Sequence, residues 1–290
     1  MKSFILNFIQ SIASIGKVII LSKFNNILNL KDNRKKECII LGNGPSLTKS
    51  IKKYSLELNN YDLICVNNFV ASDLFSEIKP SFYIIAAPIF FKPENELSSI
   101  YLELRNNIFS KLQIKTNWNL NLMVPFVAKK SSYFQHFLES NSFITPIYFN
   151  ATPIEGLKFV NNFLFNLGLG MPRPHNIVIP AIMNCIYLNY EKIYLIGADH
   201  SWLPEISVNQ QNEALVNQKH FYDENESKPL KMEDYITRPR RLHEIIHKFY
   251  LTFKGYWEIK SYANYKKVQI YNSSEYSMID AFEKREIKKY

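Results

Sequence analysis

The stretch that most constrains the fold is ECIILGNGPSLTKSIKK, residues 37–53. An apolar run enters a Gly-Asn-Gly-Pro-Ser turn, and the residues that follow have the pattern of a helix, whose first turn accommodates Pro45 well. The chain has only 8 glycines in 290 residues, so two of them around one asparagine indicate a turn with a specific backbone requirement. A buried strand, a tight turn and a helix form the opening unit of an α/β sheet.

The remaining chain repeats this alternation. Apolar runs that end in polar or turn residues predict strands, and longer amphipathic patterns predict helices between them. We expect strands at 38–41, 62–69, 80–88, 120–126, 142–149, 192–202 and 268–274, and helices at 45–54, 95–112, 152–168, 176–190, 238–260 and 277–285. Thr152 and Glu155 have capping-box spacing at the third of these helices. The alternation predicts an α/β, Rossmann-like fold, with a mostly parallel sheet and helices on both faces.

Two segments determine the expected domain organisation: the first thirty residues and the polar stretch 203–237. The first thirty residues have apolar side chains at helical spacing with interspersed lysines, no signal-peptide cleavage site and no uninterrupted apolar run of spanning length. They predict a basic amphipathic helix that lies on an anionic membrane surface or packs on the domain or on another subunit. We therefore expect this helix and a linker over 1–36, one catalytic domain over 37–290, and a lid over 203–237.

Composition and charge narrow the function classes. Hydrophobic residues make up 47% and charged residues 21%, which is typical of a globular chain, and the net charge of +9 favours an anionic partner. Cys38, Cys65 and Cys185 are far apart in apolar runs, which predicts buried thiols. The sequence HEIIH at 243–247 matches a zinc-peptidase pattern but lies far from the glycine turn, so we expect a solvated helix face and no metal. The basic residues form no recognisable RNA-binding motif with aromatic ones, so we expect no nucleic-acid partner.

Polar residues follow three of the predicted strands. They lie at 42–46, 67–69 and 197–202. Ligands of a doubly wound sheet bind beyond the carboxyl ends of its strands, so these segments predict a site. Gly42 can turn the chain tightly, Gly44 lets the backbone approach a phosphate, and Asn43 can present its amide to a phosphate or ribose, next to a helix N-terminus. An ordinary strand–helix turn is the alternative, and the spacing matches neither a dinucleotide fingerprint nor a P-loop.

IILGNGPSL resembles the N-terminal nucleotide-binding motif of the bacterial sialyltransferases of glycosyltransferase family 42. It equally resembles that of the MptE-like group, which includes flagellin-glycosylating accessory proteins and pterin diphosphokinases. CVNNF (65–69) is similar to the segment that closes the second strand of the sialyltransferases, and 171–202 is similar to their central Arg-helix-strand-Gly-x-Asp unit. The resemblance covers about residues 37–202 and implies a variant of the type A glycosyltransferase fold. It also implies inverting, metal-independent transfer from a cytidine-monophosphate (CMP) sugar.

The resemblance also implies which residues bind the donor. They are Gly42, Asn43, Gly44, Ser46, Asn67 or Asn68, Arg173, Asn176 and Gly197. Asn43 and Ser46 correspond to the motif that holds the donor phosphate and sugar, and Arg173 to the segment near the sugar. The chain departs from the family at Ala86 and Ala87, where the family has an asparagine. These departures leave room for an acidic sugar other than sialic acid.

Inverting transfer needs a base for the acceptor hydroxyl and, without a metal, hydrogen-bond donors for the departing phosphate. Among the 6 histidines, His220 stands on the predicted lid, similar to where the sialyltransferases place their base. His200 follows the strand-terminal Asp199 and is the alternative base; it can also merely order the loop. The family's phosphate-assisting tyrosine pair is replaced by His200-Ser201-Trp202, with Tyr222 further along.

These observations lead to one expectation and two alternatives. We expect a transferase that needs no cofactor and moves sialic acid or a related sugar from its CMP donor to a cell-surface glycan or lipid-linked acceptor, as in lipopolysaccharide synthesis. We expect it in the cytoplasm, peripheral on the inner membrane face, and homo-oligomerisation is possible. One alternative is a magnesium- and ATP-dependent diphosphokinase, which needs several carboxylates where only Asp199 is clear. The other is a basic nucleic-acid-binding protein.

Overall fold

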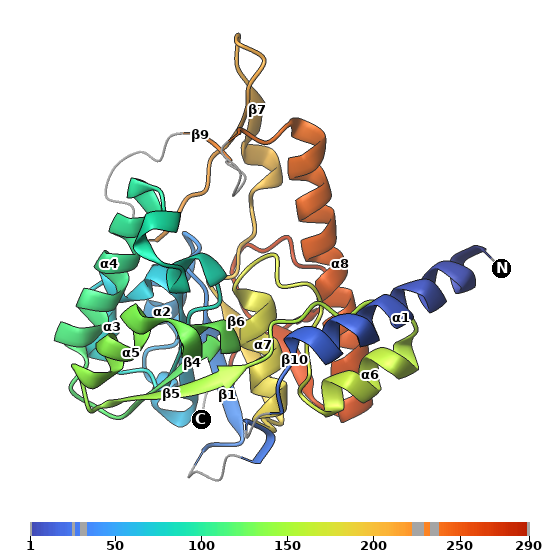
Figure 1. The fold of residues 1–290 in the computed structure, drawn as a ribbon. Helices are drawn as coiled ribbons and strands as arrows, with labels where there is room; N and C mark the ends of the chain where they lie inside the picture. Colours follow the sequence, from blue (N-terminus) through green and yellow to red (C-terminus); the bar gives the residue numbers. More distant parts are fainter. Residues whose placement is uncertain (1, 25–26, 30–33, 222–228, 233–237, 289–290) are drawn as a thin grey trace.

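The computed structural model describes residues 2–24, 27–29, 34–221, 229–232 and 238–288. Within them, an eight-stranded sheet has the order β11-β10-β6-β1-β2-β3-β4-β5, and every neighbouring pair is parallel (Figure 1). Its strands are β1 (Glu37–Leu41), β2 (Asp62–Val66), β3 (Phe82–Ile84), β4 (Leu120–Pro125), β5 (Ile144–Phe149), β6 (Lys192–Ile196), β10 (Gln269–Asn272) and β11 (Glu283–Lys284). The expected α/β, Rossmann-like fold is confirmed, and so are all seven predicted strands.

Helices cover both faces of this sheet. They are α2 (Leu47–Lys53), α3 (Leu74–Ile78), α4 (Ser99–Lys115) and α5 (Ser132–Glu139) from the first half, and α6 (Lys158–Asn166), α7 (Val178–Tyr187) and α8 (Leu242–Lys266) from the second. Alternate residues of β1 separate two cores: Cys38 and Ile40 pack with α7 and α8, whereas Ile39 and Leu41 pack with α2, α4 and α5. Both faces of the sheet are therefore buried, as a parallel sheet requires. The three cysteines are free and buried, as predicted.

The chain changes direction across the sheet between β1 and β6. Strands β1 to β5 follow one another outward on one side, and β6, β10 and β11 follow outward on the other. The two central strands are in register from Glu37↔Lys192 to Leu41↔Ile196, so their carboxyl ends lie together. A doubly wound sheet binds ligands at such a reversal of strand order, and the fold therefore indicates one position for a site.

The polar stretch 203–237 contains a second, antiparallel sheet. Its strands are β7 (Ile206–Val208), β8 (Ala214–Val216) and β9 (Leu230–Lys231), in that order. Ala214 and Val216 pack against Ile245 and Phe249, which anchors this sheet on α8 (Figure 1). The expected lid is thus partly a structured hairpin on α8, and its residues 222–228 and 233–237 lie outside the described residues.

One helix prediction was wrong and another was wrong in part. Residues 277–285 form a loop and the edge strand β11, because backbone and side-chain bonds hold the segment extended: Met278 N–H donates to Asp199 O (2.9 Å) and Asn272 Nδ2 to Ile279 O (3.1 Å). The helix expected over 152–168 begins only at Lys158. The segment before it makes hydrogen bonds to another helix, α1, instead of capping its own.

The N-terminal helix α1 (Lys2–Leu21) is confirmed. Its Ser14 hydroxyl donates to Glu155 O (2.8 Å), and Leu157 N–H donates to Ser11 Oγ (2.8 Å). The stretch Phe4–Leu21 is long and apolar enough to cross a membrane by length and composition. The sequence contains no uninterrupted apolar run of spanning length. The average hydropathy of this helix is nevertheless high, because its isolated polar residues lower the average only slightly. The division of the chain at residue 36 stays a prediction.

Candidate functional site

A cavity of about 240 Å³ lies beyond the carboxyl ends of β1 and β6, at the reversal of strand order. Three groups of segments line it: the turns after β1, β2 and β6, the loop entering α7, and the end of the β8 loop together with one face of α8. Their lining residues are 42–45, Asn67, 175–178, 197–202, 218–220, Lys248, Phe249 and Thr252. The position agrees with the site predicted from the polar ends of the strands.

The glycines of the first turn pack that turn against the loop after β6. Gly42 N–H donates to Ile196 O (2.9 Å), and Gly44 N–H donates to Gly197 O (2.8 Å). A Cβ on Gly44 would lie 2.5 Å from Asp199 Oδ2, and one on Gly42 would lie 2.5 Å from Gly197 O. Gly197 itself has φ +63°, which favours glycine. The missing side chain of Gly44 therefore makes room for a neighbouring loop, and its role in phosphate approach stays a prediction.

Asp199 and Ser46 bind each other. The Asp199 carboxylate accepts the Ser46 backbone N–H at 2.8 Å and the Ser46 hydroxyl on its other oxygen. Only 2% of Asp199 is exposed, and burial raises its pKa even though the bonds from Ser46 act in the opposite direction. The negative charge faces the start of α2, where a helix dipole favours it. Both residues thus hold two loops together, and the roles of Ser46 in phosphate binding and of Asp199 in catalysis stay predictions.

Four polar atoms of the lining residues have no hydrogen-bond partner within the described structure. They are Asn43 Oδ1, Asn67 Oδ1, Asn176 Nδ2 and His175 Nε2. Buried polar atoms in folded proteins are nearly always bonded to protein, water or ligand. The residues that line the cavity therefore hold two acceptors, one amide donor and one imidazole nitrogen unsatisfied beside it. Asn68, the other predicted asparagine, lies outside the lining.

The orientation of Asn176 is fixed by the start of α7. Its Oδ1 accepts the N–H groups of Val178 (2.8 Å) and Ile179 (3.2 Å), and it also accepts the hydroxyl of Tyr256 on α8 (3.1 Å). The amide Nδ2 is consequently the end of the side chain that has no partner. Ile177 and Val178 line the same cavity, so the N-terminal turn of α7 and its positive dipole end reach the site.

His200 is part of the wall. Its ring stacks on Trp202 with centroids 4.2 Å apart, and its Nε2 bonds to the Tyr256 hydroxyl. Because that hydroxyl donates to Asn176, His200 Nε2 is the donor to Tyr256. Burial lowers the pKa of His200 to about 3. His200 is thus linked through the Tyr256 hydroxyl to Asn176, and its alternative role as the base stays a prediction.

His175 lines the cavity close to several positive charges. Burial lowers its pKa, and so do the charges of Arg173, Lys248 and Arg240, to about 4. The ring is thus neutral at pH 7, and its environment favours an anion. Lys219 and Lys248 also line the cavity, whereas Asp199, the one acidic residue among the described lining residues, is bonded to Ser46. These charges suit a phosphorylated or carboxylated ligand.

His220 reaches the cavity from the β8 loop. The next residue fixes its position: Phe221 N–H donates to Asn43 O (3.1 Å), and the Phe221 ring packs on Phe69 with centroids 5.3 Å apart. The loop is therefore bonded directly to the first turn. His220 is half-buried and lines the cavity, as a base on a lid should. Tyr222, predicted beside it, lies outside the described residues.

Two other predicted groups lie away from the cavity. The Arg173 guanidinium donates to Glu155 Oε2 (2.9 Å) and is not part of the lining. In the HEIIH segment, Glu244 pairs with Arg238 (2.6 Å) and both histidines are exposed, which agrees with a solvated helix face. Within the described residues, no group of three or more His, Cys, Asp or Glu side chains could hold a metal ion.

Sequence reasoning missed three residues of this site. His175, Lys248 and Tyr256 were not assigned any role, although His175 stands next to the expected donor-binding Asn176. Lys248 and Tyr256 come from a helix more than sixty positions further along, and only the packing of α8 on α7 brings them in. Only its position next to Asn176 could have pointed to His175, because a single histidine in a loop matches no motif.

No family model and no curated protein sequence matches the chain. Among solved structures, it is similar to the MAf glycosyltransferase from Magnetospirillum magneticum AMB-1, with a TM-score of 0.49 and 10% sequence identity. The match covers 91% of this chain and 35% of that one, so the chain spans about a third of that protein's length.

Proposed function

We propose that the chain is an inverting glycosyltransferase whose donor, a CMP-linked acidic sugar, binds in the cavity between β1 and β6. The observation that carries the proposal is the set of unpartnered polar atoms of Asn43, Asn67, Asn176 and His175 around one positively charged cavity. A nucleotide sugar offers ribose hydroxyls, base edges and phosphate oxygens to such a set. The choice of cytidine comes from the resemblance of the first turn.

Different residues of the cavity are suited to different parts of the donor. Asn43 and Asn67 follow the ends of β1 and β2 and present acceptors, which suits ribose hydroxyls or the amino group of a base. Asn176 Nδ2 presents a donor, and Lys248 and the dipole at the start of α7 present positive charge, which suits the phosphate. Trp202 stacks between His200 and Phe249 and gives the cavity an aromatic wall.

In the proposed step, the acceptor hydroxyl oxygen attacks the anomeric carbon of the donor sugar. Its proton passes to His220, and the bond from the anomeric carbon to the phosphate oxygen breaks with its electron pair on CMP. The growing phosphate charge is stabilised by Lys248 and the start of α7, in place of a metal ion. His175, neutral in the empty cavity, becomes a better proton holder once an anion lies beside it, so it can donate to the same phosphate.

A thermal-shift panel tests donor binding. CMP, CDP, UDP, ATP and ATP with magnesium are compared on the wild type, on Asn67→Ala and on Asn68→Ala, a matched control outside the lining. We expect CMP to stabilise the wild type without metal, and the shift to be lost only in Asn67→Ala. A shift that requires magnesium and ATP would instead support the diphosphokinase alternative.

Mass spectrometry of reaction products tests the transfer itself. A panel of CMP-sugars is incubated with a lipid-linked glycan acceptor, and the expected product is heavier by one acidic sugar residue. Free CMP and free sugar without a heavier acceptor would mean that the site only hydrolyses the donor.

A further inference from the structure

Helix α1 has its polar face inside and its apolar face outside. The docked side consists of Ser11, Ser14, Val18 and Ser22, all less than 10% exposed, at i, i+3, i+7 and i+11. Ten apolar residues on the other faces are more than 40% exposed: Phe4, Ile5, Leu6, Phe8, Ile9, Ile12, Ile15, Ile19, Ile20 and Leu21. A surface helix of a water-soluble domain has the opposite arrangement.

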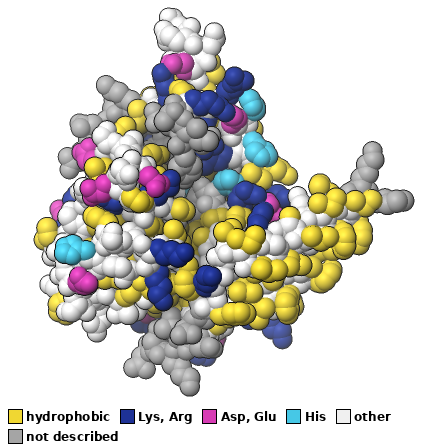
Figure 2. Space-filling view, in the orientation of Figure 1, with side chains coloured by type: hydrophobic (Ala, Val, Ile, Leu, Met, Phe, Trp, Pro, Cys, Tyr) yellow, Lys and Arg dark blue, Asp and Glu magenta, His cyan; other side chains and the backbone are white. Residues whose placement is uncertain are grey.

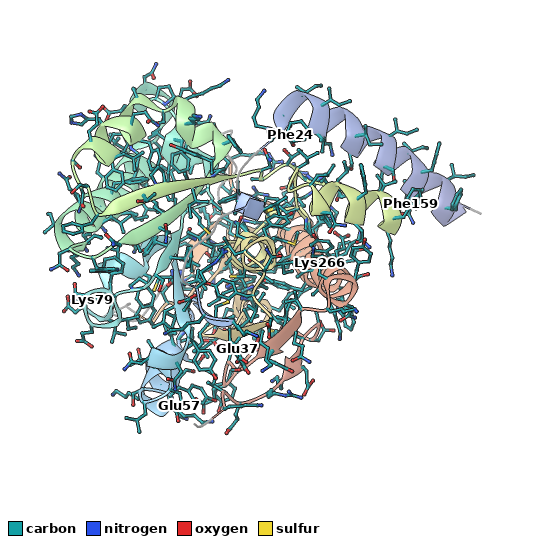
Figure 3. The ribbon with its side chains drawn as sticks, turned by 90° about the horizontal axis from the view of Figure 1, so that it is seen from below. Phe24, Glu37, Glu57, Lys79, Phe159 and Lys266 are labelled. Carbon is teal, nitrogen blue, oxygen red and sulfur yellow. The ribbon has the colours of Figure 1, made fainter. Side chains whose placement is uncertain are left out.

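Helix α6 continues this apolar surface. Phe159, Phe163 and Leu167 are spaced at i, i+4 and i+8, and their exposed fractions are 72%, 63% and 38%. The two helices lie side by side in both views (Figures 1 and 3), and Figure 3 labels Phe159 on α6 and Phe24, which follows α1. Figure 2 shows hydrophobic side chains along the whole arm that they form. We call the exposed residues of α1 and α6, with Phe24, the apolar arm.

The charges on the apolar arm are all positive. Neither α1 nor α6 contains Asp or Glu, whereas Lys17 and Lys158 lie within them and Lys23 follows α1. Two copies of this chain that met through the arm would bring these lysines together. Anionic lipid headgroups would instead complement them, while the acyl boundary receives the apolar side chains.

We propose that the apolar arm is a membrane-docking surface, which lies flat in the headgroup region of an anionic bilayer. The arm stays attached to the domain: besides the bonds of Ser11 and Ser14, the Ser22 hydroxyl donates to Thr152 Oγ1 (2.8 Å), and Asn150 Nδ2 donates to Lys23 O (2.7 Å). A spanning α1 would expose these serines to acyl chains and would leave α6 behind.

The docked segment connects the bilayer to the cavity. Ser14 and the Glu155 backbone exchange two hydrogen bonds, of 2.8 and 2.9 Å, and the Glu155 carboxylate pairs with Arg173. His175 N–H in turn donates to Arg173 O (2.9 Å). Two residues, Glu155 and Arg173, thus link Ser14 of α1 to His175 in the wall of the cavity. This short connection suits a substrate presented at the bilayer surface. The docking proposal itself does not depend on the proposed activity.

Vesicle co-sedimentation of the full chain tests the proposal. The wild type is compared on phosphatidylcholine vesicles and on vesicles that contain phosphatidylglycerol, and we expect binding that is stronger on the anionic ones. Ile12→Glu and Phe159→Glu should each lower the partition coefficient at least about tenfold, because each removes a buried side chain and adds a repelled charge. Ile114→Glu is the matched control, since Ile114 is 81% exposed on α4, away from the arm; it should bind like the wild type.

Three outcomes would overturn the proposal. Binding that is lost in Ile12→Glu but unchanged in Phe159→Glu would mean that α1 acts alone, as a spanning helix would. A wild type that ignores vesicles but elutes as a dimer, which Ile12→Glu dissociates, would mean that a second copy covers the arm. Equal loss in Ile114→Glu would mean that the substitutions act through folding, which circular dichroism of each variant checks.

Discussion

Replacing Asp199 by asparagine separates a structural role from a catalytic one. The carboxylate accepts two bonds from Ser46, one from the N–H at 2.8 Å and one from the hydroxyl. An asparagine offers one oxygen, so its amide NH₂ would face the second donor. A buried donor left unsatisfied costs about 1–3 kcal/mol, and the lost charge at the start of α2 costs about 0.3–1 kcal/mol. Relief from burying a charge offsets part of this, since burial already raises the pKa of Asp199.

We therefore expect Asp199→Asn to lower the free energy of unfolding by about 2 kcal/mol. Urea unfolding measures it, with Asp73→Asn as the matched control. The Asp73 side chain is 99% exposed and its pair with Lys115 is 3.3 Å long, so that variant should change stability by less than about 0.5 kcal/mol. Turnover of folded Asp199→Asn should stay near that of the wild type. If stability is unchanged and turnover is lost, Asp199 acts in catalysis, and the structural role argued for it is refuted.

Four further predictions follow from the site. Gly44→Ala should destabilise the fold by about 1–3 kcal/mol in urea unfolding, because its Cβ would lie 2.5 Å from Asp199 Oδ2; a neutral effect would show that the two loops can separate. His220→Ala should lower turnover about 10²–10⁴-fold with CMP affinity nearly intact, and calorimetry showing weak binding with normal turnover would remove it as base. The pKa of His175, about 4 without ligand, should rise when CMP binds, as histidine NMR titration can show; a constant value would place the phosphate elsewhere. The pKa of His200 is lowered to about 3 from an ordinary 6.5, so between pH 3 and 6.5 the unfolded chain binds more protons than the folded one. The free energy of unfolding should therefore rise with pH over this range, and His200→Asn should flatten the slope when unfolding is measured at several pH values. An unchanged slope would contradict the burial of His200.

The sheet could be predicted because its strands are short apolar runs with polar ends, a pattern that depends on local sequence. Thr152 and Glu155 misled the helix prediction, because their capping pattern is overridden by bonds to α1, some 130 residues earlier in the chain. The last predicted helix failed for a similar reason, since Asp199 and Asn272 hold residues 278 and 279 in a loop.

The position of the site was predictable, but the roles of its residues were not. The polar residues after three predicted strands locate the cavity from sequence alone, because ligands of a doubly wound sheet bind beyond the strand ends. The bond between Ser46 and Asp199 joins residues 153 positions apart, so nothing local distinguishes these side chains from free ligand-binding groups. Asn67 and Asn68 are likewise equivalent in the sequence, and only the backbone turn, with φ +47° at Asn67, decides which one lines the cavity.

The most direct measurement is calorimetric titration of CMP, without metal, into the wild type, Asn43→Ala and Asn68→Ala. The account predicts that the wild type binds CMP, that Asn68→Ala matches it, and that Asn43→Ala raises Kd at least about tenfold, since one hydrogen bond to an unpartnered carboxamide oxygen is lost. A wild type that binds no CMP, or an Asn43→Ala variant with unchanged affinity, would contradict the claim that this cavity is the donor site.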